Sequence, residues 1–395
     1  MTTRERVRCG DGLAVDANLV HAAERAVADA LVAMDDIVPD LAVIFACGPE
    51  PDDVTSALTR AAELSGARTV LGCNAPGVIG AGQGIELTSS VSVWLGRLPG
   101  VTVRSFHLEV LRTSEAIAVV GMPPVATTDT ESDRTVAVLF ADPYSFPVDA
   151  FVAQSHDALP GLPIIGGNAS GLRGAGSTRL LVDGVVHDRG AVGVLLGGAL
   201  AQRTIVSQGC RPVGPTMTVT AAEGNVIRGL AGLPALRKLE QVVADLPPQE
   251  QAMVSAGVQV GVARDEYADE HRLGDFLVRG VVGADPDGKS LVIGDVVEVG
   301  QTVQLQVRDA ESADKDLVAS LAAVHGAGEV AGALLFSCTG RGSALFGDAH
   351  HDVRAVRDGL TTGAVAGFFA AGEIGPVAGR THLHSFTACV LAFLH

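Results

Sequence analysis

Two arginines and one glutamate are placed where they could bind a small charged molecule. Arg211 directly follows Cys210, and Arg341 lies three residues after Cys338. A guanidinium can hold a ligand carboxylate through two parallel hydrogen bonds, which are stronger in a desolvated cleft than at the surface. Glu373 offers the complementary chemistry, because a carboxylate accepts hydrogen bonds from an ammonium group. One cavity that contains both kinds of charge would suit an amino acid.

Each arginine could also serve the fold alone. Arg211 or Arg341 would then form an ion pair with Glu373 or Asp275, because buried charges are usually paired. The sequence leaves the ligand role and the structural role open.

A glycine-rich segment that occurs twice provides the next candidate residues. Residues 71–82 return as residues 165–176, with seven of twelve positions identical. A weaker third copy, residues 372–375, matches residues 77–80 but has Glu373 where the first copy has Val78. Glycines after strands let a ligand approach closely, and successive backbone N–H groups can bind an anion. The alternative is that these glycines only form tight turns.

The segments around the glycine loops predict the elements that position them. Each copy reads as strand, helix, strand, glycine loop and strand, and this order indicates mixed sheets covered by helices. The predicted helices are residues 52–65, 147–159 and 352–360, with Asp52 or Asp53 as the cap of the first. Repeated units in matched order usually place their special loops around one pseudo-symmetric centre. The fold class is therefore α/β with diverged repeats.

The residues from about 223 have a different pattern. A helix is predicted over residues 226–243, with Pro234 near a break. Strands are predicted over residues 257–262, 274–282, 290–292 and 302–307, separated by Asp/Gly turns. The segment therefore indicates the start of a second domain.

Composition excludes several classes of protein. The chain has 395 residues, 47% of them hydrophobic, and a formal charge of -17. Nucleic acid and anionic membrane surfaces would repel such a chain. Because residues 1–8 lack the apolar stretch of a signal peptide and no uncharged run is long enough to span a bilayer, we expect a cytoplasmic protein without membrane insertion.

Short motifs resemble the FIST family in the right order over most of the chain, from about Leu41 to the end. The motifs are residues 207–214, 222–227, 274–279, 307–309, 336–342, 372–376 and 383–387. The resemblance implies a helical extension over residues 1–40, a FIST N-like domain over 41–222 and a FIST C-like domain over 223–395. The first of these domains would hold two repeats, at about 41–110 and 136–210.

The resemblance also implies a function. Family members are regarded as intracellular sensory modules that bind small ligands, with amino acids proposed, and are often joined to signalling domains. This sequence ends directly after its last predicted strand, so we expect a stand-alone sensor that acts on a separate partner. Closure of one domain on the other would transmit the signal. The expected ligand-binding residues are Cys73, Asn74, Gly77, Asn168, Ser170, Gly171, Cys210, Arg211, Cys338, Thr339, Arg341, Gly372, Glu373 and His384.

Two rival hypotheses come from other classes of protein. Some FIST-like proteins are regarded as haem-based nitric oxide sensors, for which His384 would be the axial ligand. A thiol-dependent enzyme would need a reactive cysteine, and Cys73, Cys210 or Cys338 could have a neighbouring arginine that lowers the thiol pKa. A buried structural role is the alternative for each of these residues. The sequence lacks G-x-S-x-G, H-E-x-x-H and P-loop motifs, and it favours a binding protein without a cofactor over an enzyme.

Overall fold

The computed structural model describes residues 6–35, 37–112, 117–125, 135–264, 275–324, 326 and 328–395. Contacts divide the chain into two compact units. The first contains Met1–Ser207, Leu317–Leu383 and Thr387–His395, and the second contains Gln208–Asp316 and His384–Phe386. The compact units do not follow the predicted division at residues 222 and 223, because the last part of the chain returns to the first unit.

One order of elements, strand, helix, strand, hairpin and strand, occurs three times in the first unit. The first repeat contains β2 (Leu41–Cys47), α2 (Pro51–Ser65), β3 (Thr69–Asn74), β4 (Gly77–Gly80), β5 (Gln83–Glu86) and β6 (Ser90–Arg97). The second contains β9 (Val136–Ala141), α3 (Val148–Ala158), β10 (Ile164–Asn168), β11 (Leu180–Val182), β12 (Val185–His187) and β13 (Ala191–Gly198). The third contains β22 (Val330–Cys338), α7 (His351–Leu360), β23 (Val365–Ala370), β24 (Glu373–Val377), β25 (Arg380–His384) and β26 (Thr387–Leu394).

The repeats exchange their hairpins in a closed ring. The first repeat's hairpin pairs with the third, where Val78 of β4 lies opposite Phe368 of β23. The third repeat's hairpin pairs with the second, where Glu373 of β24 lies opposite Gly167 of β10. The second repeat's hairpin pairs with the first through β11 and β3. Because every repeat both gives and receives a hairpin, none of the three sheets is made by one repeat.

The resulting sheets are mixed, which confirms the predicted fold class. Their strand orders are β1-β6-β2-β3-β11-β12, β25-β24-β10-β9-β13-β7-β8 and β14-β26-β22-β23-β4-β5. In each sheet the first two strands of a repeat are parallel, and their neighbours run antiparallel to them. The remaining elements of this unit are β1 (Arg8–Val15), α1 (Leu19–Ala33), β7 (Val101–Arg112), β8 (Ile117–Val120), β14 (Gln202–Gln208) and part of α6 (Ala310–Ala322).

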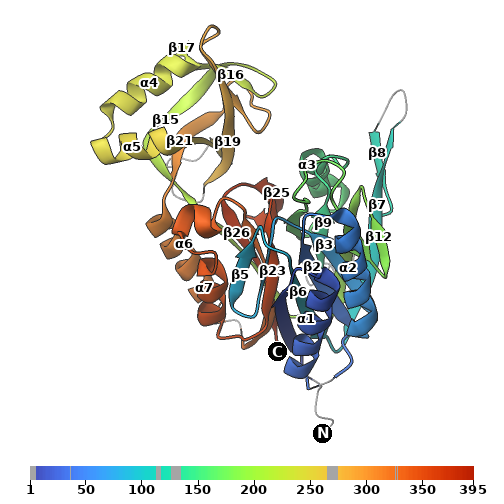
Figure 1. The fold of residues 1–395 in the computed structure, drawn as a ribbon. Helices are drawn as coiled ribbons and strands as arrows, with labels where there is room; N and C mark the ends of the chain where they lie inside the picture. Colours follow the sequence, from blue (N-terminus) through green and yellow to red (C-terminus); the bar gives the residue numbers. More distant parts are fainter. Residues whose placement is uncertain are drawn as a thin grey trace. The chain divides into compact units, whose positions relative to one another are not determined.

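The inner faces of the three sheets share one hydrophobic core. Phe140 of β9 packs against Phe45 of β2, Phe336 of β22 and Phe368 of β23, with ring centroids 5.4 to 5.6 Å apart. The outer faces are covered by helices, as α1 and α2 cover the first sheet (Figure 1). The alternation of side chains along each strand therefore separates an aromatic centre from three helix-covered layers.

The same glycine occurs in all three repeats where the two parallel strands meet. Gly72, Gly166 and Gly367 each lie opposite an aliphatic residue of the preceding strand. A Cβ atom on Gly367 would collide with the carbonyl oxygen of Leu335, and the other two glycines face equivalent carbonyl oxygens. This close approach of two backbones explains why the glycine signal repeats along the sequence.

Replacing one of these glycines tests the packing requirement. We expect Gly367→Ala to lower the free energy of unfolding by about 1–3 kcal/mol, because the added methyl group forces the strands apart. Thermal or urea unfolding measures this change. The control is Gly283→Ala in the second unit, where the nearest atom to an added Cβ is 4.0 Å away. Equal stability of the two variants would contradict the close-approach explanation.

The second unit consists of one sheet with two short helices. Its strands are β15 (Cys210–Glu223), β16 (Val226–Leu230), β17 (Leu233–Pro234), β18 (Val258–Ala263), β19 (Phe276–Asp285), β20 (Ser290–Ile293) and β21 (Thr302–Arg308), in the order β15-β21-β18-β19-β20-β16-β17. The helices are α4 (Ala235–Asp245) and α5 (Pro248–Ala256). The four strands predicted between residues 257 and 307 are present as β18 to β21, although Gly274 lies outside the described residues.

Two local predictions were wrong, and a third was incomplete. The helix predicted over residues 226–243 begins only at Ala235, because residues 226–230 pair as a strand with β15 and β20, and Pro234 is the helix cap. The segment predicted as a helical extension, residues 1–40, contains α1, but it also contains β1, which pairs with β6. The cap of α2 is Glu50, not Asp52 or Asp53, and its first turn contains a proline. Proline is well suited to that turn, since its missing N–H would be unsatisfied there anyway.

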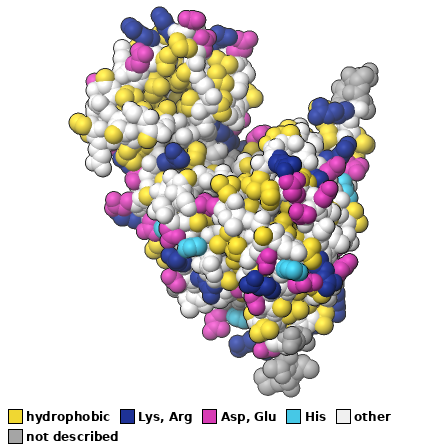
Figure 2. All heavy atoms as spheres, in the orientation of Figure 1, with side chains coloured by type: hydrophobic (Ala, Val, Ile, Leu, Met, Phe, Trp, Pro, Cys, Tyr) yellow, Lys and Arg dark blue, Asp and Glu magenta, His cyan; other side chains and the backbone are white. Residues whose placement is uncertain are grey.

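The acidic surplus is spread over the surface. On the face shown in Figure 2, Asp and Glu side chains are interspersed with Lys and Arg and do not form one acidic patch. Several of them form exposed pairs, such as Arg8 with Asp35 and Lys315 with Glu311. Among the described residues no helix is long and apolar enough to cross a membrane.

Candidate functional site

A buried polar cluster lies where β22 ends and β24 begins, in the first unit. It consists of Ser337, Cys338, Arg341, Asp352, Glu373 and Thr387. The carboxyl ends of parallel strands are the usual ligand-binding edge of α/β sheets. The π-helical turn Gly342–Phe346 directly follows Arg341, and such turns occur often at functional sites. The location therefore favours a functional site.

Arg341 is bound to Asp352 by two hydrogen bonds. Its Nε and Nη2 atoms lie 2.7 and 2.9 Å from the two carboxylate oxygens, and both side chains are almost completely buried. Ser337 Oγ donates a further hydrogen bond of 2.7 Å to Asp352. Burial opposes ionisation of Asp352, but the charge of Arg341 and the hydrogen bonds from His351, Arg341 and Ser337 outweigh it and hold its pKa well below the usual range. The structural ion pair considered for Arg341 thus exists, with Asp352 as the partner.

Glu373 has one satisfied and one unsatisfied oxygen. Its Oε2 atom accepts hydrogen bonds from the backbone N–H and the hydroxyl of Thr387, at 3.1 and 2.8 Å. Its Oε1 atom is buried and has no hydrogen-bond partner among the described residues. Burial raises the pKa of Glu373 to about 8, and hydrogen bonds from Thr387 and Cys338 and the charge of Arg341 offset only part of this effect. The side chain is therefore mostly protonated at neutral pH.

The other two repeats show that the fold does not require a carboxyl group at this position. Three residues occupy equivalent places in the three sheets: Glu373, Val78 and Leu180. Each is paired with a residue of the neighbouring strand, and that residue is in turn paired with a core phenylalanine of the same sheet. Val78 and Leu180 are completely buried in the central core. An ionisable group in the place of two aliphatic side chains is costly to bury, and such groups are often functional.

Exposed residues lie near the cluster along the chain. Glu373 is two residues from the exposed Ala371, and Arg341 is two residues from the exposed Thr339. The backbone N–H of Thr339 donates to the carbonyl oxygen of Ala370 at 3.0 Å, so these two short segments lie side by side. Of the predicted residues, the structure brings together Cys338, Thr339, Arg341, Gly372 and Glu373.

The two predicted asparagines anchor incoming hairpins. Asn74 donates to the carbonyl oxygen of Ser177 and accepts from the N–H of Arg179, at 2.9 and 2.7 Å. Asn168 occupies the equivalent place in the second repeat, and its backbone N–H donates to the carbonyl oxygen of Gly372. Its Oδ1 atom is buried without a partner among the described residues. Since successive strand residues point to opposite faces, Asn168 and Glu373 lie on different faces of their sheet.

The two matched glycine segments differ in structure. Gly77 begins strand β4, whereas Gly171 lies in a longer loop that reaches its strand, β11, only at Leu180. An added Cβ on Gly171 would collide with Ser177, so this glycine makes a tight turn possible. The neighbouring Ser170 and the predicted Cys73 are buried. The two segments therefore share the end of a strand, β3 or β10, but the loops that follow these strands differ.

The remaining predicted residues belong to the second unit. Arg211 forms ion pairs with Glu250 and Asp309, at 2.9 and 3.0 Å, and is about a quarter exposed. Its neighbour Cys210 and the predicted haem ligand His384 are both buried. Arg211 therefore forms two structural ion pairs, and their partners differ from the predicted Glu373 and Asp275.

Burial disfavours the reactive form of four of the six cysteines. No disulfide joins any two of the six, all of which lie in the described part of the chain. Burial raises the pKa of Cys47 to about 11, and it raises the pKa values of Cys9, Cys73 and Cys389 well above the usual range. A raised pKa disfavours the thiolate, which is the reactive form. Among the described residues no three His, Cys, Asp or Glu side chains gather as metal ligands. The haem and thiol hypotheses stay predictions.

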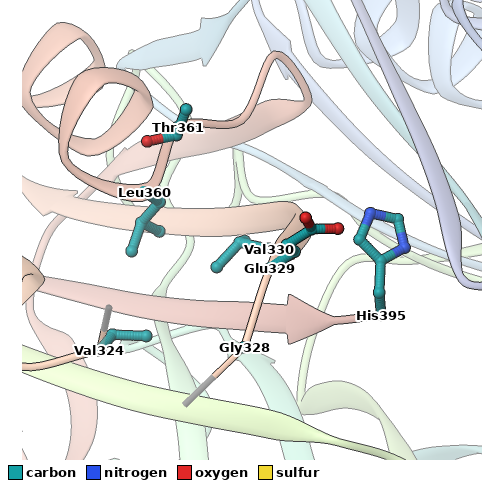
Figure 3. A pocket seen from close by; sticks show the side chains of 7 residues that line it. All are labelled: Val324, Gly328, Glu329, Val330, Leu360, Thr361 and His395. Carbon is teal, nitrogen blue, oxygen red and sulfur yellow. The ribbon is translucent and has the colours of Figure 1, made fainter. Parts of the chain in front are cut away.

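An open pocket of about 510 Å³ lies elsewhere in the first unit (Figure 3). Its lining residues are Val324, Gly328, Glu329, Val330, Leu360, Thr361 and His395. Val330 begins β22 and Cys338 ends it, so this pocket and the buried polar cluster are about 26 Å apart along the strand. Its polar side chains, Glu329, Thr361 and His395, are exposed. The chemistry of the cluster, and not the size of this pocket, therefore defines the candidate site.

Three members of the cluster were missing from the predicted site: Ser337, Asp352 and Thr387. Asp352 lies in the first turn of α7, and Thr387 begins β26. The pattern contained one usable signal, because the first turn of a helix that follows a parallel strand lies at the same edge as the strand end. The contact of Thr387 with Glu373 joins two strands that do not share a ladder, and no local pattern reports it.

The fold and the cluster define a mixed α/β protein in which three repeats exchange hairpins around a central core. Two family models match the chain: the FIST N domain covers residues 40–233, and the FIST C domain covers residues 235–376. The chain belongs to the FIST family, which confirms the resemblance seen in its motifs. FIST domains are associated with signal transduction and small-ligand sensing.

Mycobacterial proteins are similar to this chain over their whole length. An uncharacterized protein of Mycobacterium tuberculosis is 40% identical over 393 residues, which cover 98% of this chain and all of the relative. An uncharacterized protein of Mycobacterium bovis is 39% identical over 390 residues, or 98% of this chain and 99% of the relative. The similarity therefore extends over both units of this chain, and the relatives are uncharacterized.

The titration of Glu373 makes a testable prediction about stability. Because the folded protein holds this proton up to about pH 8 and the unfolded chain releases it near pH 4.5, stability falls as the pH rises between these values. We expect the loss to be on the order of a few kcal/mol and to be absent in Glu373→Gln, which is neutral at every pH. Thermal unfolding of both proteins across this pH range measures the difference. Parallel pH profiles would show that Glu373 is ionised throughout.

Proposed function

We propose that this protein is a cytoplasmic small-ligand sensor that binds an amino acid or a small carboxylic acid at the buried polar cluster and signals to a separate protein. The observation that carries the proposal is the buried carboxyl group of Glu373, whose Oε1 atom has no partner among the described residues. The equivalent Val78 and Leu180 show that an aliphatic side chain satisfies the fold. The carboxyl group is therefore retained at a cost in stability, which function would explain.

Two further observations support a binding role. The ion pair of Arg341 with Asp352 fixes two polar side chains near Glu373, and groups that are already fixed need no reorganisation when a small molecule binds. We infer that a ligand reaches the cluster past the exposed Thr339 and Ala371, which lie two residues from Arg341 and Glu373 along the chain. The six free cysteines agree with a reducing compartment.

A thermal-shift screen tests the proposal. The protein is heated with each standard amino acid and with a set of small carboxylic acids. A ligand at a hundred times its dissociation constant stabilises a protein by about 3 kcal/mol, which raises the melting temperature by several degrees. We expect such shifts for one chemical group of compounds and their loss in Glu373→Gln.

Glu373→Gln is the informative variant because it keeps the shape of the side chain. Its carbonyl oxygen can still accept from Thr387, while an NH2 group replaces the unpartnered Oε1 atom. The matched control is Glu63→Gln, which changes an exposed carboxylate of α2 in the same unit. Shifts that persist unchanged in Glu373→Gln would show that the ligand binds elsewhere, and no shift with any compound would contradict small-ligand binding of these classes.

A further inference from the structure

The two charged groups of the cluster are not equally available to a ligand. Two nitrogen atoms of Arg341, Nε and Nη2, already bind the oxygens of Asp352. A ligand carboxylate that sought the same two-pronged contact would have to displace a buried, ionised side chain. Glu373 Oε1, in contrast, has no partner among the described residues. Both Thr387 donors bind Oε2, so loss of the Oε1 proton leaves a carboxylate oxygen that can accept a hydrogen bond from a ligand. An ionised Glu373 therefore favours a hydrogen-bond donor as the ligand group.

The groups that surround Glu373 also favour a cationic ligand. Cys338 of β22 donates to it, Thr387 of β26 donates twice, and Cys389 of β26 lies beside it. Arg341 is the nearby cation, but Asp352 of α7 balances its charge. Gly167, directly opposite on β10, has no side chain. Ionised Glu373 would leave one uncompensated negative charge in this cluster, and a cationic ligand would neutralise it.

We propose that Glu373 recognises the ammonium group of its ligand and that binding of this group expels the proton that Glu373 holds in the ligand-free protein. The inference rests on the proposed function and specifies its ligand chemistry. The carboxylic acid of Glu373 and the ligand ammonium combine to give a carboxylate–ammonium pair and one proton, which passes to the solvent. No covalent bond forms or breaks apart from the O–H bond of Glu373. The sensor thereby selects amines and amino acids over simple acids.

Matched compounds separate the two ligand groups. The probes are sets of three: an amino acid, the primary amine that lacks its carboxyl group, and the acid that lacks its amino group, for example alanine, ethylamine and propionate. We expect the amino acid and the amine of at least one set to raise the melting temperature, and its acid to have no effect. Both shifts are lost in Glu373→Gln and retained in the control Glu63→Gln.

Isothermal titration calorimetry of the amine that binds measures the proton directly. Since the pKa of Glu373 is raised to about 8, the side chain is about nine-tenths protonated at pH 7. We expect the binding heat at pH 7 to differ between phosphate and Tris buffers by the amount that corresponds to the release of about one proton. At about pH 9.5 Glu373 is already ionised, and we expect only a small release.

The outcomes distinguish this inference from the proposed function. If acids bind without proton release and this binding is lost in Glu373→Gln, the inference about the ammonium group is overturned, while the proposed location of the ligand site is supported. Binding of amines with the same heat in both buffers at pH 7 would show that Glu373 is ionised before the ligand arrives, and would also overturn it. Absence of binding by every member of every set would contradict the proposed function itself.

Discussion

The exchange of hairpins among three repeats is the constraint on which the rest of the structure depends. Each hairpin leaves its own sheet and pairs with the second strand of another repeat, so the three sheets close around one aromatic core. This exchange carries Glu373 to β10 of the second repeat while it remains beside β26 of its own repeat. A glycine in each repeat, such as Gly367, lets the paired strands come close enough for this arrangement. The site is therefore a product of the topology and not of one local motif.

The buried polar cluster makes use of one departure from the pseudo-symmetry. Two repeats fill the position of Glu373 with Val78 and Leu180, and these side chains belong to the central core. The third repeat places a carboxyl group there and surrounds it with a balanced ion pair of Arg341 and Asp352. Because that pair is neutral overall, it does little to favour an ionised Glu373, and burial determines the protonation state. A fold that tolerates a protonated acid in its core can respond to a ligand that ionises it.

Local pattern predicted much of the fold and part of the site. The apolar runs and helical spacings placed β2, α2, β9, α3, β22 and α7 within a few residues, since these elements form from adjacent positions in the chain. Pattern failed where distant segments decide, as for residues 226–230, which form a strand because β15 and β20 lie beside them. Arg341 and Glu373 were proposed as ligand-binding charges, and both are buried, but the sequence did not indicate their contacts with Asp352 and Thr387, which depend on how α7 and β26 pack.

The protonation state of Glu373 in the ligand-free protein tests the central claim most directly. The infrared difference spectrum between the wild-type protein and Glu373→Gln isolates the carbonyl band of this one carboxylic acid. The account predicts that the band is present at pH 7 and disappears as the pH rises through about 8. A spectrum at pH 7 that shows only the carboxylate bands of Glu373 would contradict it.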